Sequence, residues 1–264
     1  MNDSNIQIII PMTGYGSRFK AAGYQKLKPF INVRGKPLIE WVLKLFPNNV
    51  DEISFICQKN HLERLDYIKP TLKKLAPNSK IYEVNNWEKK GPVNDVIQKS
   101  YFIDDNKPVI ICYCDFYMHW DYNTFKQEVL ERNCDGAIPC YTGFHPHLLP
   151  PENLYASCKV DKNENLIKIR EKFSWEVDKK KARHSPGLYY FRSGYIMKKY
   201  CKIMMEAKDH INGEYYASLP FNYMVDNGLK VWCPINIPFF CQWGTPEDLN
   251  ESLFWINLVE RLKK

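Results

Sequence analysis

The sequence has no long apolar run. No segment approaches the roughly 18–20 consecutive apolar residues of a transmembrane helix, and the first four residues, Met-Asn-Asp-Ser, lack the layout of a signal peptide. The nine cysteines contain no Cys-x-x-Cys pair and no zinc-ligand spacing. Unpaired thiols in this number indicate a reducing compartment. We therefore expect a cytoplasmic protein without a membrane partner.

Long runs of one charge are also absent. The formal net charge is +7, yet the longest run of cationic residues is Lys179–Lys181. A dedicated nucleic-acid surface needs a longer basic stretch or face, so we do not expect nucleic acid as a partner. The positive balance favours an anionic small molecule instead.

The 264 residues contain no internal repeat, low-complexity tract or linker, and this length suits one large α/β domain. Strand and helix patterns alternate through the first half, which predicts a Rossmann-like, mostly parallel sheet with helices on both faces. The second half opens with a hairpin pattern and favours a small β-rich subdomain. The expected strands are 6–10, 52–57, 80–84, 108–113, 135–140, 155–160, 165–170, 188–192, 230–233 and 239–242. The expected helices are 37–45, 62–75 with a break at Pro70, 92–102, 122–132, 194–207, 215–227 and 246–262.

Residues 11–37 carry the most informative pattern in the chain. They follow an apolar strand and contain Gly14 and Gly16, whose backbone can turn sharply and present N–H groups to an anion. Arg18 adds a cation two residues later, and Lys28 adds a second one. A strand, a glycine loop and two cations together predict a polyphosphate site.

Two other glycine-loop motifs do not match. A dinucleotide-binding fingerprint needs a third glycine three residues after Gly16, where this chain has Phe19. A P-loop closes with Gly-Lys-Ser/Thr, whereas Ser17 and Arg18 follow Gly16 here. The remaining alternative is an ordinary strand-to-loop turn with two surface cations, and the added Lys28 disfavours it.

A carboxylate follows the most apolar of the expected strands. Asp115 comes directly after the run Val109–Cys114. Ligands gather at the carboxyl ends of parallel strands, and a carboxylate there can hold Mg²⁺ against phosphates. We predict that Asp115 is a magnesium ligand; the alternative is an aspartate that only caps a turn.

No Ser-His-Asp or Cys-His pattern indicates a covalent nucleophile. His145 and His147 flank a proline, and we expect a lid or a solvated turn there rather than a metal site. A direct in-line displacement at a phosphate needs no such nucleophile, because the protein only positions the reactants and neutralises charge.

The loop resembles the signature of the nucleotidyltransferase family that includes sugar-1-phosphate and phosphocholine nucleotidylyltransferases. That signature is a strand, Gly-x-Gly-Ser/Thr-Arg and then Lys-Pro, which stand here as Gly14–Arg18 and Lys28-Pro29. The family often has a further glycine where this chain has Thr13. The resemblance implies an enzyme that joins an NTP to a phosphorylated acceptor and releases pyrophosphate, with Arg18 and Lys28 as catalytic cations. It also implies that the nucleotide is bound by Met12, Thr13, Gly14, Tyr15, Gly16 and Ser17.

The resemblance covers nearly the whole chain. The turn at Gly91-Pro92 corresponds to a family segment that packs against the base and ribose, and Asn85 and Asn86 are candidates to read the base edge. A plain helix start is the alternative for this turn. In the family, a metal-binding aspartate ends the central strand, as Asp115 does here.

The acceptor side of the family pattern is present with one departure. Lys172 matches a lysine that contacts the acceptor phosphate, and Tyr189 lies in a strand that passes under the acceptor. Many sugar-1-phosphate enzymes have a second metal-binding aspartate where this chain has Gln242. This departure leaves Mg²⁺ on Asp115, the triphosphate and water, and makes Gln242 a candidate to bind the acceptor.

The forms Met12–Phe19 and Gln242–Pro246 most resemble the capsular-polysaccharide branch of the family. The resemblance implies CTP as donor and L-glutamine phosphate as acceptor, for a phosphoramidate modification of a capsule. The alternatives are a sugar-1-phosphate or phosphocholine nucleotidylyltransferase and, in another class, a non-catalytic nucleotide-sensing homologue. The expected single domain, 1–264, comprises a nucleotide-binding half (1–140), an acceptor-binding or lid half (141–245) and a C-terminal helix (246–264). The oligomeric state stays open, a homo-oligomer included.

Overall fold

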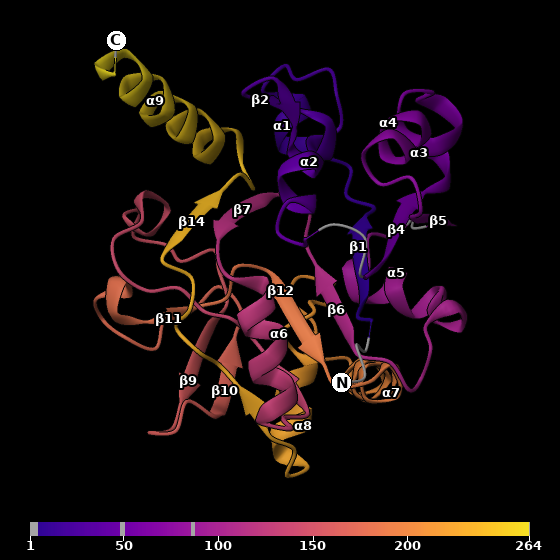
Figure 1. Cartoon of the computed structure of the whole chain (residues 1–264), viewed down its shortest axis with the longest axis vertical. Coiled ribbons are helices and arrows are strands. Elements are labelled where there is room, and N and C mark those ends of the chain that lie inside the picture. Colours follow the sequence, from indigo (N-terminus) through magenta and orange to yellow (C-terminus); the bar gives the residue numbers. More distant parts are fainter. Residues whose placement is uncertain (1–4, 48–50, 86–87, 264) are drawn as a thin grey trace.

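A seven-stranded sheet forms the centre of the computed structural model, which describes residues 5–47, 51–85 and 88–263 (Figure 1). The strand order is β13-β8-β12-β6-β1-β4-β5. Neighbouring strands are parallel except β12, which is antiparallel to both β6 and β8. The expected mostly parallel sheet is therefore confirmed. The strands are β1 (Gln7–Met12), β4 (Glu52–Gln58), β5 (Lys80–Val84), β6 (Val109–Cys112), β8 (Gly136–Ala137), β12 (Leu188–Phe191) and β13 (Val231–Trp232).

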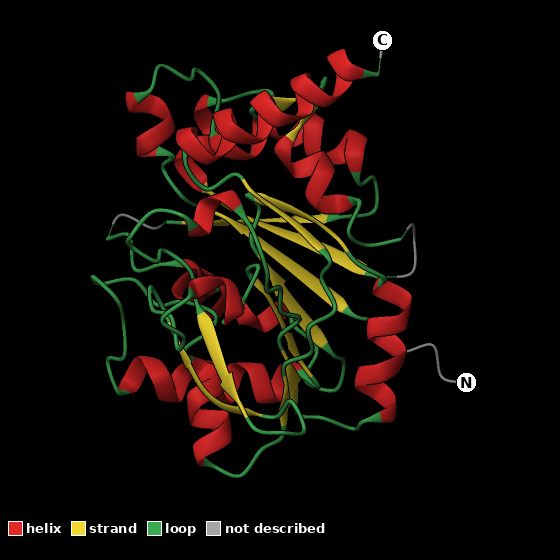
Figure 2. Ribbon diagram, turned by 90° about the vertical axis from the view of Figure 1, so that its left-hand side faces the viewer, coloured by secondary structure: helices red, strands yellow, loops and turns green. Residues whose placement is uncertain are grey.

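Helices cover both faces of this sheet (Figure 2), which explains why β1 and β6 are apolar on both sides. Ile8 and Ile10 of β1 belong to one core, and Ile9 between them belongs to the other. The first core is covered by α2 (Leu38–Leu43), α3 (Lys59–Arg64), α4 (Ile68–Leu75) and α6 (Tyr122–Glu131). The second is covered by α5 (Pro92–Gln98), α7 (Gly194–Glu206) and α8 (Pro220–Asp226).

Smaller sheets and short helices complete the fold. The expected hairpin is present as β9 (Ser157–Val160) and β10 (Leu166–Arg170), with β11 (Arg183–His184) as the third strand of its sheet. Two further ribbons pair β14 (Phe239–Gln242) with β7 (Phe116–His119), and β2 (Asn32–Val33) with β3 (Lys36–Pro37). The short helices are α1 (Ser17–Ala21), η1 (Lys28–Phe30), η2 (Ser100–Phe102), η3 (Pro146–Leu148) and η4 (Lys179–Lys181).

The C-terminal helix α9 (Pro246–Leu262) has the expected limits and extends away from the rest of the molecule (Figure 1). It begins at Thr245, whose hydroxyl accepts a hydrogen bond from the Asp248 N–H at 3.2 Å. Within the described ranges, no helix has the length and apolar character needed to cross a membrane.

The pattern at 62–75 forms two helices rather than one helix broken at Pro70. Leu65 adopts an extended backbone after α3, and α4 begins at Ile68. Pro70 therefore lies in the first turn of α4, where its missing N–H costs no helical hydrogen bond. The expectation of a break at proline was wrong because proline is tolerated at a helix start. Similarly, the expected strand at 135–140 is reduced to β8 and one bridge from Cys140 to Ile235.

The expectation of a lid or solvated turn at His145 and His147 was also wrong. Both side chains are buried against Tyr141 and Phe240, and the Tyr141 hydroxyl hydrogen-bonds to Nε2 of His147 at 2.9 Å. Burial lowers the pKa of His147 to about 3 and also lowers the pKa of His145. The pair is thus a neutral part of the core.

Candidate active site

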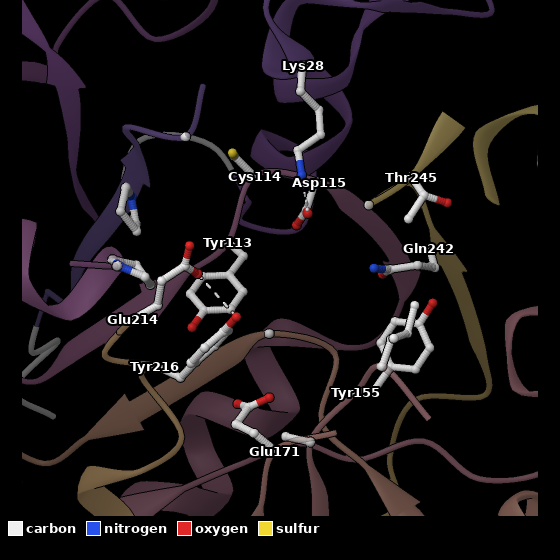
Figure 3. A pocket seen from close by; sticks show the side chains of 18 of the residues that line it. Lys28, Tyr113, Cys114, Asp115, Tyr155, Glu171, Glu214, Tyr216, Gln242 and Thr245 are labelled. Carbon is white, nitrogen blue, oxygen red and sulfur yellow. Dashed lines mark hydrogen bonds and ion pairs between the residues drawn. The ribbon is translucent and has the colours of Figure 1, made fainter. Parts of the chain in front are cut away.

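A cavity of about 450 Å³ opens at the carboxyl ends of β1 and β6, where ligands of parallel sheets gather. Figure 3 shows Lys28 and Asp115 on one side of it and Glu171 on the opposite side. The loop after β1 contributes Thr13, Gly14, Tyr15, Ser17, Arg18 and Lys28 to the lining. The remaining predicted residues in the lining are Gly91, Pro92, Asp115, Lys172, Tyr189 and Gln242. The structure therefore brings together most of the predicted site.

The phosphate loop, residues 13–18, turns into α1 through one glycine in particular. Gly16 has φ 62°, in the left-handed region that favours glycine, and precedes the first residue of α1. Gly14 has no positive φ, and a Cβ there would have nothing within 4 Å. Gly14 therefore leaves open space at the cavity rather than making the sharp turn that we expected of it.

A buried carboxylate holds this loop from behind. Asp95, in the first turn of α5, has no exposed surface and accepts a hydrogen bond from the Thr13 hydroxyl. Thr13 itself is 7% exposed. Hydrogen bonds are electrostatically stronger in a dry interior than in water, so this contact fixes Thr13 at the point where β1 becomes the loop. This anchor replaces the glycine that the resembling family often has at that position.

Lys28 and Asp115 form an ion pair inside the cavity. The Lys28 ammonium donates to Oδ2 of Asp115 at 2.7 Å, and both side chains are only partly exposed, at 24% and 21%. Burial alone lowers the pKa of Lys28, but the charge and hydrogen bond of Asp115 reverse the sign and the pKa is raised. Lys28 is thus held cationic inside the cavity.

Gln242 and Asp115 meet because β14 pairs with β7, which places Gln242 opposite Phe116. The Trp243 N–H donates to the Asp115 carbonyl at 2.9 Å and fixes this pairing at its end. A Cβ at Gly244 would lie 2.5 Å from Nε2 of Gln242 and 3.5 Å from Oδ2 of Asp115. Gly244 therefore makes room for the Gln242 amide close to the Asp115 carboxylate.

The turn at Gly91 is built for close backbone packing. Gly91 has φ 86°, and a Cβ there would lie 2.7 Å from the Tyr215 nitrogen. The Tyr215 N–H donates to the Lys90 carbonyl at 2.8 Å, and its carbonyl accepts from the Val93 N–H at 3.2 Å. The glycine thus joins the start of α5 to the segment before α8, and both border the cavity.

A second part of the lining, here called the acceptor wall, comes from the segments 154–156, 171–172, 185–189, 214–216 and 242–248, the last of which lies beside Asp115. Lys172 has φ 51°, and its ammonium lies 6.0 Å from the centre of the Tyr216 ring. Glu171 accepts a hydrogen bond from the Ser218 hydroxyl. Burial raises the pKa of Glu171 to about 7, while Ser218 and Lys172 oppose the shift. The wall therefore presents a cation beside a carboxyl that is easily protonated.

Three predicted nucleotide-binding residues do not line the cavity. Met12 packs in the core, Gly16 acts through its backbone conformation, and Asn85 is exposed beyond the end of β5. Asn86, the other candidate to read the base, lies outside the described residues. Tyr189 reaches the cavity but is 1% exposed, so most of its ring belongs to the core.

Sequence reasoning missed several residues of the site. Lys89 lines the cavity, and its ammonium lies 5.1 Å from the centre of the Tyr15 ring. Asp248 and Glu214 also line it, and burial raises the pKa of Asp248. The sequence places Asp248 in the C-terminal helix without a role in the site, and no local pattern marks the others. Their place in the site comes from contacts between distant segments.

No protein-family model matches this sequence, and no curated protein matches it. Solved structures with the same fold do exist. A nucleoside-diphosphate-sugar pyrophosphorylase from Vibrio cholerae RC9 is 18% identical with a TM-score of 0.74, covering 94% of this chain and 99% of its own. The inositol-1-phosphate CTP transferase from T. maritima is 16% identical with a TM-score of 0.70, and the match covers 95% of this chain and 94% of that one. HddC from Yersinia pseudotuberculosis is 20% identical with a TM-score of 0.62, and the match covers 95% of this chain and 99% of that one. The chain thus has the nucleotidyltransferase fold over nearly its whole length.

Proposed function

We propose that this protein is a Mg²⁺-dependent cytidylyltransferase that joins CTP to a small phosphorylated acceptor. The observation that carries the proposal is the cavity itself, whose lining combines the phosphate loop, Lys28 and Asp115 with Lys172. Two anionic reactants need cations on both sides, and this arrangement supplies them. A nucleotidyltransferase fold shared with a CTP transferase and with pyrophosphorylases supports the reaction class.

The reaction is a single displacement at phosphorus. A phosphate oxygen of the acceptor forms a bond to the α-phosphorus of CTP, and the bond from that phosphorus to the bridging oxygen breaks. The electron pair leaves with pyrophosphate. Lys28 and Arg18 are placed to neutralise the charge that develops on the leaving group, and Lys172 holds the acceptor phosphate in line.

Asp115 is the proposed magnesium ligand. Mg²⁺ in nucleotide sites is usually bound by one or two carboxylates together with phosphates and water. The Asp115 carboxylate fits this donor set, because it lines the same cavity as the phosphate loop and offers the one carboxylate that the phosphates and water would complete. When bound, Mg²⁺ would supply positive charge to the phosphates. Lys28 already pairs with Asp115, so it provides the balancing charge in the absence of the metal.

The preferred acceptor is L-glutamine phosphate, which would give CDP-L-glutamine for modification of a capsular polysaccharide. This molecule carries an ammonium group as well as a phosphate. Glu171 and Asp248, whose pKa values burial raises, line the same wall as Lys172. A bound ammonium would favour the ionised form of both carboxyls. Gln242, in place of a second carboxylate, adds an uncharged group that can hydrogen-bond to the acceptor.

A sugar-1-phosphate is the second candidate acceptor, because the pyrophosphorylase with this fold acts on nucleoside-diphosphate sugars. Phosphocholine and a non-catalytic nucleotide sensor are the remaining alternatives. A sensor would need no cation on the acceptor side, and Lys172 argues against it.

Pyrophosphate release tests the proposal directly. Each of the four NTPs is incubated with Mg²⁺ and with phosphoglutamine, phosphocholine, glucose-1-phosphate or no acceptor. We expect release only with CTP and phosphoglutamine. Release of pyrophosphate with a hexose-1-phosphate instead would show that the acceptor is a sugar-1-phosphate and would keep the proposed reaction class. Nucleotide binding without any release of pyrophosphate would favour a sensor.

A further inference from the structure

Three cysteines that are far apart in the sequence meet in the core, away from the residues to which we assign catalysis. The thiol cluster consists of Cys140, Cys158 and Cys233, whose sulfur atoms all lie within 4.8 Å of one another. Their exposed fractions are 0%, 4% and 0%. Of the described residues, no histidine, aspartate or glutamate belongs to the group. The cluster therefore offers three sulfur donors and no other ionisable donor.

Backbone pairing holds each cysteine in place. The Cys140 N–H donates to the Pro234 carbonyl at 2.8 Å, and the Cys233 N–H donates to the Glu164 carbonyl at 2.9 Å. Cys158 lies in β9, opposite Arg183 of β11. The three sulfurs are thus positioned by the junction between the central sheet and the β9-β10-β11 sheet, before any ion binds.

The spacing of the sulfurs suits one shared metal ion. Three sulfurs bound at about 2.3 Å to an ion in their plane lie about 4.0 Å apart. Each pair in the cluster is within 4.8 Å, so closure on an ion needs only small side-chain movements. Thiolates select soft cations such as Cu(I) and Zn(II) over Mg²⁺.

A nearby cation reduces the cost of burying the thiolates. The Arg183 guanidinium donates to the Cys233 carbonyl at 2.6 Å and to the Glu164 carboxylate at 2.9 Å. Binding of an ion displaces thiol protons and leaves a net negative charge, which is costly in a dry core unless a positive group is close. Arg183 supplies a positive group, and its ion pair with Glu164 offsets part of that charge.

We propose that the thiol cluster is a binding site for one soft metal ion held by three thiolates, and that Cu(I) fits it better than Zn(II). Structural Zn(II) sites are almost always four-coordinate, whereas three sulfurs satisfy Cu(I). The ion would join β9 to the segments that follow β8 and β13. Ala156, two residues before Cys158, lines the cavity, so the ion would also brace the acceptor wall. This site is independent of the proposed transferase activity.

Competitive metal titration of the reduced, full-length protein tests the site. Cu(I) and Zn(II) are added in separate experiments, under anaerobic conditions, in the presence of a coloured chelator that competes for the metal. The samples equilibrate overnight, because a buried site is reached only through local opening of the structure. We expect wild type to take one more equivalent of Cu(I) than Cys158→Ser does, and to gain thermal stability on loading. Cys201→Ser, a buried cysteine outside the cluster, serves as the matched control and should behave as wild type.

X-ray absorption on wild type loaded with one equivalent of Cu(I) provides a second measurement that needs no folded variant. It should find three sulfur neighbours at about 2.2–2.3 Å from the metal. Equal Cu(I) uptake by wild type and Cys158→Ser, or a shell of nitrogen and oxygen atoms, would overturn the proposal. Tighter binding of Zn(II) with a fourth, oxygen ligand would overturn the preference for Cu(I). If Cys158→Ser does not fold, Cys233→Ala takes its place in the titration.

Discussion

The two sides of the cavity are built in opposite ways. The phosphate side comes from one continuous stretch, residues 13–28, completed by Asp115. The acceptor wall is assembled from five separate segments between residues 154 and 248. Phosphates are recognised by backbone N–H groups and nearby cations, which a short loop can provide alone. An acceptor of particular shape and charge needs groups from several directions, which only a folded chain can bring together.

Charge distinguishes the two sides as well. Arg18, Lys28 and Lys89 lie on the side that would receive the triphosphate. The acceptor wall combines Lys172 with buried carboxyls, and the pKa of Glu171 is raised to about 7. The comparison predicts that changes on the phosphate side act on the chemical step, while changes on the acceptor wall act on the choice of acceptor and on pH dependence.

Asp115→Asn should have the largest effect. The substitution preserves size but removes the charge that would hold Mg²⁺, so we expect turnover to fall by ~10³-fold, the equivalent of several kcal/mol. Steady-state pyrophosphate release against Mg²⁺ concentration measures the loss. Asp105→Asn, at an exposed carboxylate paired with Lys198, is the matched control. Full activity of Asp115→Asn would remove this residue from the mechanism.

Lys28→Met should lower kcat by ~10²–10³-fold, because the ammonium neutralises charge that develops only as pyrophosphate leaves. The expected signature is a fall in kcat with little change in the KM for CTP. Lys26→Met removes an exposed ammonium two residues away and should leave both constants unchanged. A Lys28→Met variant with normal kcat and a raised KM for CTP would mean that Lys28 binds the substrate and the transition state equally well.

Lys172→Ala tests the acceptor wall. Loss of a charged hydrogen bond to the acceptor phosphate should lower kcat/KM for phosphoglutamine by ~10–100-fold. Calorimetry with CTP alone should give an unchanged affinity, since we assign Lys172 to the acceptor and not to the nucleotide. Lys168→Ala, at an exposed position on β10, provides the control. A large loss of CTP affinity would place Lys172 on the nucleotide and would break the contrast between the two sides.

The buried histidines of the second half predict loss of stability in acid. The pKa of His147 is lowered from 6.5 to about 3 by burial, so the unfolded chain binds a proton that the folded chain does not. Stability should be complete above pH 6.5 and fall as the pH decreases toward 3, by ~2 kcal/mol at pH 5. Urea unfolding at pH 7.5 and 5 measures this. His147→Gln should lose less on acidification, whereas the exposed His119→Gln should lose as much as wild type.

Glu171 should produce an effect of opposite sign. Its pKa is raised from 4.5 to about 7 by burial, so its contribution to stability is complete below pH 4.5 and is lost as the pH rises through 7. Compared with Glu171→Gln, wild type should lose ~2 kcal/mol of unfolding free energy between pH 5 and 7.5. Phosphoglutamine should reduce this difference if its ammonium pairs with Glu171. No difference between the two proteins in that pH interval would mean that Glu171 is not desolvated.

Much of the fold was predictable because its elements have strong local signals. The limits of β5 and α9 agree with expectation. The strand-favouring residues Ile81, Tyr82 and Val84 define β5, and a capped amphipathic pattern defines α9. The prediction missed the short strand β7 and made β13 too long. Their pairing depends on partners far away in sequence, Phe239–Gln242 and Gly136–Ala137.

The sequence alone determined the phosphate side, because a loop between one strand and one helix carries its own geometry and charge in consecutive residues. The tertiary structure decided the rest. It buried His145 and His147, placed Asp95 behind Thr13 and gathered the acceptor wall and the thiol cluster from separate segments. Spacing along the chain says nothing about such groups, since their proximity and their pKa values depend on strand order and burial, which exist only once the chain has folded.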